Sequence, residues 1–134
     1  MRQLKNRLTK ADAFLVVTPE YNHSFPAILK QVIDVSSAAW KAKPVAFISY
    51  GGVSGGLRAV EQLRLVYAEL HAVTVRNVVS IINAGDKFDA RGRWQSVEQK
   101  VRAEKRLTQQ LAVLRWWGQS LKAGRRRPEF AAVS

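Results

Sequence analysis

Two loops carry the residue types that could hold a polar ligand. The first, Thr18–Ser24, follows the apolar run Phe14–Val17, and the second, Gly51–Gly56, follows the apolar run Val45–Tyr50. Short apolar runs bounded by turn residues are typical of buried strands. In open α/β sheets, ligands bind in the crevice outside the carboxyl ends of the strands. Both loops are therefore predicted to lie at the binding edge of a sheet.

The first loop offers several groups to a ligand. Its backbone N–H groups could seat a phosphate, with Asn22 and Ser24 available to cap the helix expected to begin near Pro26. Tyr21 can supply a flat aromatic surface and a hydroxyl. Glu20 can accept hydrogen bonds or act as a carboxylate near a helix N-terminus. The same residues are also compatible with a plain capped turn.

The second loop holds four glycines in six residues. Glycine allows the backbone to approach a ligand without a Cβ in the way. The pattern matches neither the dinucleotide fingerprint nor the P-loop, which needs a Lys-Ser/Thr pair. A tight strand-to-helix turn explains this loop taken alone. Two such loops at adjacent strand ends together predict a planar, polar-edged ligand held by backbone amides.

Apolar periodicity predicts the elements that position these loops. Strands and helices alternate, which predicts a parallel sheet with helices on both faces and three strands side by side. The last helix is expected to face the sheet through apolar residues at helical spacing. The expected elements are the end of a helix in 1–12, strands at 14–17, 45–50 and 73–82, and helices at about 26–40, 57–71 and 95–121, the last facing the sheet through Val97, Val101, Leu107, Leu111 and Leu114.

Length and composition exclude several classes of protein. The 134 residues suffice for one domain, predicted over 1–121, followed by a basic, flexible tail at 122–134. Without cysteine, the chain has no disulfide, thiolate zinc site or cysteine nucleophile. No apolar run approaches the roughly 18 residues of a membrane span. A cytoplasmic protein with no membrane partner is expected.

The net charge of +12 is concentrated near the chain ends. Residues 1–10 carry four basic residues and no acid, and residues 100–127 carry nine basic residues against Glu104. Such segments can attract nucleic acid or anionic membranes. No RNP aromatics, zinc spacing or helix-turn-helix accompanies them, so a solubilising tail and a solvated helix face are the favoured interpretation.

Other residues suggest no metal or acid/base chemistry. His23 and His71 lack a partner at metal-ligand spacing. Asp34 lies on a predicted helix without a paired acid. The pair Trp116-Trp117 is interpreted as packing or an oligomer contact. We therefore predict no metal site and name no catalytic residue.

Three segments resemble the NADPH-dependent FMN reductases: Pro19–Ser24, Pro26–Asp34 and Tyr50–Ala59 are similar to the second and third flavin loops of that family. The resemblance covers roughly residues 10–115. It implies a flavodoxin-like three-layer α/β/α fold, FMN as cofactor and NAD(P)H as hydride donor. The cofactor-binding residues it implies are Pro19, Glu20, Tyr21, Asn22, Gly51, Gly52, Ser54 and Gly55.

The resemblance further implies an enzyme that passes hydride from NAD(P)H to FMN and on to a small-molecule acceptor such as a quinone. The cofactor carries this chemistry and the protein positions it, so the hydride step requires no protein acid or base. A homo-oligomer, dimer or tetramer, is also implied.

The chain departs from the family before Phe14. Complete members begin with a strand and a Gly-Ser-x-Arg-x-x-Ser-type loop that holds the FMN phosphate, and neither is found here. An N-terminally incomplete fold with an open apolar strand edge is therefore expected, with weakened FMN binding. The open explanations are a misplaced start or truncated chain, a natural remnant that pairs with another subunit, and a separate polypeptide that supplies the missing half. The alternative function is a non-catalytic interaction or dimerisation module that does not hold FMN by itself.

Overall fold

The strands form one parallel sheet in the order β1-β2-β3, as the alternation of strands and helices predicted. The computed structural model describes residues 2–132. Strand β3 has the predicted bounds, whereas β1 and β2 are each slightly longer than predicted. The elements are α1 Arg2–Lys10, β1 Phe14–Pro19, α2 Ala27–Asp34, the 3-10 turn η1 Ser37–Ala39, β2 Pro44–Gly51, α3 Leu57–Glu69, β3 Val73–Ile82, the 3-10 turn η2 Ala84–Asp86, α4 Val97–Gly124 and α5 Pro128–Ala132.

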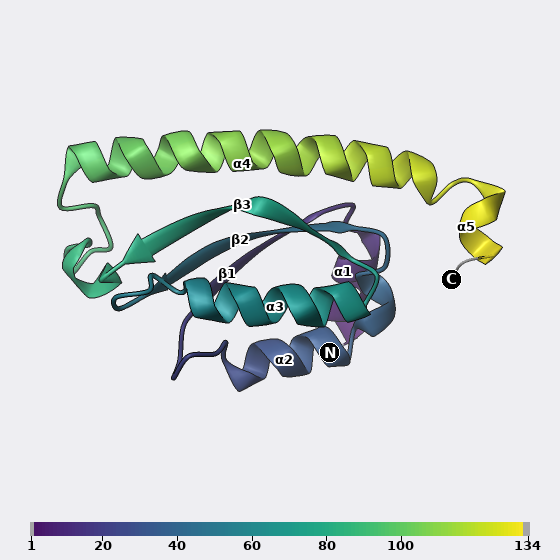
Figure 1. Ribbon diagram of the computed structural model, residues 1–134, viewed down its shortest axis with the longest axis horizontal. Helices are drawn as coiled ribbons and strands as arrows, with labels where there is room; N and C mark the ends of the chain where they lie inside the picture. Colours follow the sequence, from purple (N-terminus) through teal and green to yellow (C-terminus); the bar gives the residue numbers. More distant parts are fainter. Residues whose placement is uncertain (1, 133–134) are drawn as a thin grey trace.

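Helices cover both faces of the sheet, which gives three layers (Figure 1). On one face, Ile33 of α2 and Leu63 and Tyr67 of α3 pack against β1 and β2. On the other face, Leu114 of α4 packs against Ala46 and Val75. The predicted α/β/α layering is confirmed.

Strand β1 is buried on one face only. Phe14, Val16 and Thr18 point into the core, whereas Leu15 and Val17 are 38% and 60% exposed. In the sheet order, β1 pairs with β2 alone. The apolar run at 14–17 thus predicted the strand, but burial of both its faces is not seen within residues 2–132.

The helix predicted over about 26–40 is divided in two. Helix α2 ends at Asp34, and the chain turns at Ser36 before η1. The indole Nε1 of Trp40 donates to the carbonyl of Ile33 at 3.1 Å. The Ser36 amide donates to the same carbonyl at 3.2 Å, so the chain tightens into a last i to i+3 turn at this point instead of continuing the α-helical ladder.

The sheet-facing residues predicted for the last helix are partly wrong. Val97, Val101 and Leu111 are 79%, 56% and 41% exposed. The buried residues of α4 are Gln110, Leu114 and Gly118, at i, i+4 and i+8. Val101 lies nine residues before Gln110, about half a turn around the helix at 3.6 residues per turn, so it is on the side of α4 turned away from the sheet.

The predicted tail begins inside an ordered helix. Helix α4 continues to Gly124, and α5 follows at Pro128–Ala132. Arg125 donates to the carbonyl of Ala42 and to the carboxylate of Asp12, both at 2.7 Å. The segment up to Arg125 is therefore attached to the domain. Residues 133–134 lie outside the described residues, and the predicted flexibility of the tail stays a prediction.

None of the described helices combines the length and the apolar character that a bilayer-spanning segment requires. Helix α4 is long enough, but it is rich in Lys, Arg and Gln.

A buried glutamine joins α4 to an irregularity in the sheet. The register between β2 and β3 shifts between Val45 and Phe47, which interrupts the regular ladder. The side-chain Nε2 of Gln110 donates to the carbonyls of Phe47 and Asn77 at 2.8 and 2.7 Å. Gln110 is fully buried. It therefore ties α4 to both strands at the irregularity, while its own Oε1 is buried without a described partner.

Gln110→Met should destabilise the fold by about 1–3 kcal/mol, since it keeps the approximate side-chain volume but removes both hydrogen bonds to the strand carbonyls. The measurement is the midpoint of urea unfolding. Gln109→Met, at the exposed neighbouring position, is the control and should change stability by less than about 0.5 kcal/mol. Equal effects of the two substitutions would contradict the assigned role of Gln110.

Candidate functional site

The two loops singled out from the sequence lie side by side at the carboxyl edge of the sheet. They follow the adjacent parallel strands β1 and β2, and the amide of Glu20 donates to the carbonyl of Tyr50 at 2.9 Å. In Figure 1 this edge is at the left, where the strand arrows end. The prediction that the two loops lie together at this edge is therefore confirmed.

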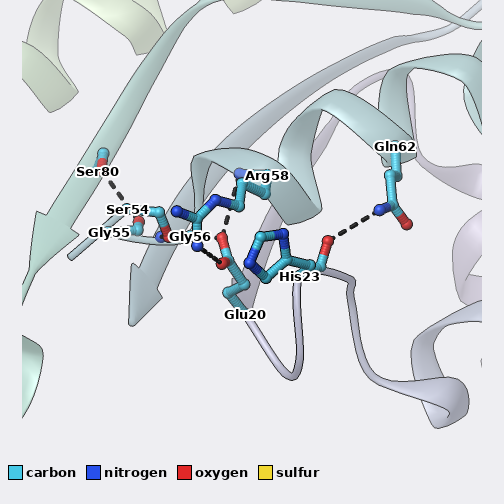
Figure 2. Close-up of polar contacts among 8 residues, drawn as sticks. All are labelled: Glu20, His23, Ser54, Gly55, Gly56, Arg58, Gln62 and Ser80. Atoms are coloured by element: carbon cyan, nitrogen blue, oxygen red, sulfur yellow. Dashed lines mark hydrogen bonds and ion pairs between the residues drawn. The ribbon is translucent and has the colours of Figure 1, made fainter. Parts of the chain in front are cut away.

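The Glu20 carboxylate ties the first loop to the second. It accepts from the Ser54 hydroxyl at 2.6 Å, and from the backbone N and the Nη1 of Arg58 at 3.1 and 3.2 Å. Figure 2 shows the side chain of Glu20 pointing toward Arg58. Arg58 lies in the first turn of α3, so Glu20 interacts favourably with that helix N-terminus. The Glu20 carboxylate therefore stabilises the N-terminus of α3, the helix after the second loop.

These contacts lower the pKa of the Glu20 carboxyl below its ordinary value of 4.5. The hydrogen bond from Ser54 is the main cause, and the backbone and side chain of Arg58 add to it against the opposing effect of burial. The Glu20 side chain is only 8% exposed. Its charge is therefore compensated within the protein.

The tip of the first loop is a tight turn anchored to α3. Tyr21 and Ser24 exchange two backbone hydrogen bonds, and both intervening residues have positive φ, 49° at Asn22 and 68° at His23. The Ser24 hydroxyl donates to Oε1 of Gln62 at 2.6 Å, and Nε2 of Gln62 donates to the His23 carbonyl at 2.8 Å. The latter contact is drawn in Figure 2.

The expectation that Asn22 and Ser24 could cap the following helix is wrong. The N-cap of α2 is Pro26, and no side chain caps that end. The turn commits the Ser24 hydroxyl to Gln62 instead, and Asn22 occupies a left-handed position that asparagine tolerates well.

The glycines of the second loop divide into two kinds. Gly55 and Gly56 have φ of +59° and +86°, and a Cβ on Gly56 would lie 2.6 Å from the Cβ of Ser49. The Gly55 carbonyl accepts from the hydroxyls of Ser49 and Ser80 at 2.8 and 3.0 Å. These two glycines let the loop pack against β2 and β3.

Gly51 and Gly52 have different surroundings. A Cβ on Gly51 would reach the Cβ of Glu20 at 3.4 Å, whereas one on Gly52 would meet no heavy atom within 4 Å. Among the four glycines of the loop, Gly52 is therefore the one that leaves open space for a ligand.

The surface beside Gly52 is apolar and aromatic. Tyr21 is 62% exposed, Tyr50 38% and Val53 83%. Within residues 2–132, the amides of Asn22 and Val53 donate to no described acceptor. With the Glu20 charge compensated by Arg58, this edge can offer flat apolar surface and N–H donors without an unpaired charge.

The predicted cofactor residues thus lie together but differ in what they contact. Pro19, Glu20, Gly51, Ser54 and Gly55 form the join between the loops, while Tyr21, Asn22 and Gly52 border the open side. Their contacts with a flavin stay predictions.

Sequence reasoning missed Arg58 and Gln62, which hold the first loop against α3. Their signal was present as two polar residues at i, i+4 immediately after the glycine loop. In the described part of the chain, no group of three or more His, Asp or Glu is placed to hold a metal ion.

Glu20→Gln should lower the stability of the fold in a pH-dependent way. Because the folded state lowers the pKa of Glu20, its stabilising contribution is full above the unfolded pKa and is lost as the pH falls through the folded pKa. The difference between wild type and variant in urea-unfolding midpoint should be full above about pH 5.5 and shrink below about pH 4.5.

Glu69→Gln is the matched control, since Glu69 is exposed at the end of α3. It should leave the midpoint near that of wild type at each pH. A pH-independent effect of Glu20→Gln would contradict an ionised Glu20 at the join.

Comparisons with known proteins identify the family of this chain. The sequence model of the NADPH-dependent FMN reductases matches residues 1–86. An NAD(P)H-dependent FMN reductase from Pseudomonas aeruginosa is 33% identical over 129 residues, which cover 91% of this chain and 67% of that protein. A quinone reductase from Pseudomonas putida is 39% identical over 77 residues, covering 52% of this chain and 41% of the relative.

Solved structures agree on the fold. The flavoenzyme FerB, an NAD(P)H:(acceptor) oxidoreductase from Paracoccus denitrificans, matches with a TM-score of 0.61 and 24% identity, over 91% of this chain and 67% of FerB. The flavodoxin-like fold implied by the loop residues is confirmed. This chain spans 41% to 67% of the length of the two curated relatives. With the family model matched over residues 1–86, the chain belongs to the NADPH-dependent FMN reductase family.

Proposed function

We propose that this chain acts as an NAD(P)H-dependent FMN reductase. In this reaction hydride passes from NAD(P)H to FMN, and the electrons pass on to an acceptor such as a quinone. Membership of the family and the similarity to a quinone reductase support the reaction class. The observation that carries the proposal is the open space at Gly52, bordered by two loops that are locked together at the carboxyl edge of the sheet.

The residues present fit the ring of a flavin better than they fit a charged ligand. A flavin ring is flat and largely uncharged, with carbonyl and nitrogen acceptors along its rim. The edge beside Gly52 offers aromatic surface from Tyr21 and Tyr50 and the amide of Val53 as a donor. Preformed donors bind such acceptors without having to reorganise.

Bound FMN would supply the redox chemistry, since flavins accept a hydride and return electrons to an acceptor. The chain's own residues would position the bound flavin and shield it. Glu20, Ser54 and Arg58 keep the two loops in one arrangement, and Tyr21 and Val53 present exposed apolar surface. No residue is assigned as an acid or base in the hydride step.

We further propose that residues 1–134 alone bind FMN more weakly than the longer relatives do. The described loops would contact the edge of the flavin ring. Neither Thr18–Ser24 nor Gly51–Gly56 contains a lysine or arginine for the FMN phosphate, and the guanidinium of the nearby Arg58 is engaged by Glu20. We also propose that the protein is cytoplasmic and forms a homo-oligomer.

One observation favours the alternative of an interaction module. Leu15 and Val17 are exposed on β1, which pairs with β2 alone within the described residues. Unpaired apolar strand edges are ready templates for pairing with another chain. In this case the protein would assemble stably without flavin.

Titration of the purified protein with FMN, followed by flavin fluorescence, tests the proposal. Gly52→Ala should weaken FMN binding at least about fivefold, or roughly 1 kcal/mol, because its methyl group enters the space proposed for the ring. Stability should change little, since that methyl group meets no protein atom within 4 Å.

Gly85→Ala is the matched control, because its Cβ also meets nothing within 4 Å, in the loop after β3. Equal FMN affinities of the two variants would contradict the placement of the ring. No fluorescence change at high micromolar FMN, together with a stable oligomer, would favour the interaction module. NADPH oxidation dependent on added FMN would support the enzyme.

A further inference from the structure

A second pocket lies apart from the join between the two loops, between the end of β3 and the first half of α4. It has a volume of about 190 Å³. Its floor is apolar, formed by the last residues of β3 and by Ala103. Its rim carries Lys87, Arg102 and Arg106, and its wall carries Trp94. Nothing in the proposed hydride transfer uses this pocket.

The α4 side of the pocket is one helix face. Gln99, Arg102, Ala103 and Arg106 follow the spacing i, i+3, i+4 and i+7, which places them on the same side of the helix. The side chains of two arginines one turn apart can therefore converge on one ligand.

The opposite side is a loop that is closely cross-linked. The Asp89 carboxylate accepts from the amides of Arg91 and Arg93, both at 2.9 Å, and from the Arg93 side chain at 2.8 Å. The rings of Phe88 and Trp94 lie 4.5 Å apart between centroids. The loop thus holds in place the Trp94 ring, which lines the pocket.

The pocket is lined by cations without acids. In the part of the chain that the structure describes, Lys87 and Arg106 make no ion pair. Arg102 pairs with Glu98 at 2.6 Å, but both side chains are about three-quarters exposed, and such surface pairs contribute little. Asp86, next to Lys87, and Glu104 and Glu98 on α4 are the nearby acids in sequence, and Glu104 pairs with Lys100 at 3.7 Å. An anion entering the pocket therefore meets a net positive rim.

We propose that this pocket binds a small aromatic carboxylate. The apolar floor and Trp94 suit a flat ring, and Lys87, Arg102 and Arg106 suit a carboxylate, which arginine can bind in a bidentate manner. Pockets for drug-sized ligands measure roughly 300–1,000 Å³, so the smaller volume here restricts the ligand to one or two fused rings.

The site touches the glycine loop without being part of it. Ser80 and Ile82 line the pocket, and the Ser80 hydroxyl donates to Gly55, as drawn in Figure 2. A carboxylate bound here would lie next to the strand that supports the Gly51–Gly56 loop. The proposal does not depend on flavin binding, so it can be tested without FMN.

Calorimetric titration of the full chain with 2-naphthoate tests the site. The neutral 2-naphthamide has the same rings and should bind at least about fivefold more weakly, because it lacks the charge that the rim attracts. Arg106→Gln should weaken 2-naphthoate binding by a similar factor. Trp94→Leu should weaken binding of both probes, since it removes the ring wall.

Arg115→Gln is the control, an exposed arginine on the same helix outside the pocket. This substitution changes the net charge by the same amount as Arg106→Gln. It should keep the 2-naphthoate affinity within about twofold of wild type. Equal effects of Arg106→Gln and Arg115→Gln would overturn the proposal, as would equal affinity for the amide and the carboxylate. Absence of any 2-naphthoate binding at millimolar concentration would overturn it as well.

Discussion

The fold depends on the burial of the first half of strand β2 on both of its faces. Val45, Ala46 and Phe47 have no exposed surface, although successive side chains of a strand point to opposite faces. Apolar surface on both sides of one strand requires a helical layer on each face, and parallel pairing on both edges satisfies its backbone. Helices α2 and α3 supply one layer and α4 supplies the other.

The same burial explains why a polar residue lies in the core. Where the pairing between β2 and β3 is irregular, backbone carbonyls of both strands lie within reach of a side chain from the covering helix. Gln110 of α4 does so with one amide nitrogen. Its position on α4 therefore fixes the rotation of the helix over the sheet, with charged residues turned outward. That rotation also presents the arginines of the second pocket.

Apolar patterning predicted the sheet well because strands and their order depend on short, local runs. Residues 73–82 are rich in β-branched residues, and β3 has those bounds. The pattern failed where tertiary contacts decide. The helix expected at 26–40 ends at Asp34, where the Ile33 carbonyl accepts from both the Ser36 amide and the buried Trp40 indole. Val97 and Val101 have helical spacing but lie on the side of α4 turned away from Gln110.

The sequence predicted that the two loops lie next to each other, but it did not predict the contacts between them. The rule that parallel strands end at one edge brought the two loops together from sequence alone. It gave no information on which polar groups the loops use on one another. Glu20 and Ser54 have residue types that suit a ligand, yet the described hydrogen bonds of their side chains join them to each other, to Arg58 and to the Gly56 amide. Glycines at Gly55 and Gly56 serve packing, a role that a glycine-rich string cannot distinguish from ligand approach.

The hydrogen bonds from Ser54 and Arg58 to Glu20 make the conformations of two distant stretches of sequence depend on each other. A change in the first loop that alters the position of residue 20 also moves the start of α3, and an altered second loop leaves a buried carboxylate without its donors. Variation in one loop is therefore constrained by the other. Loops exchanged between relatives to alter ligand preference would have to be moved as a pair, 18–24 together with 51–58, for either to keep its shape.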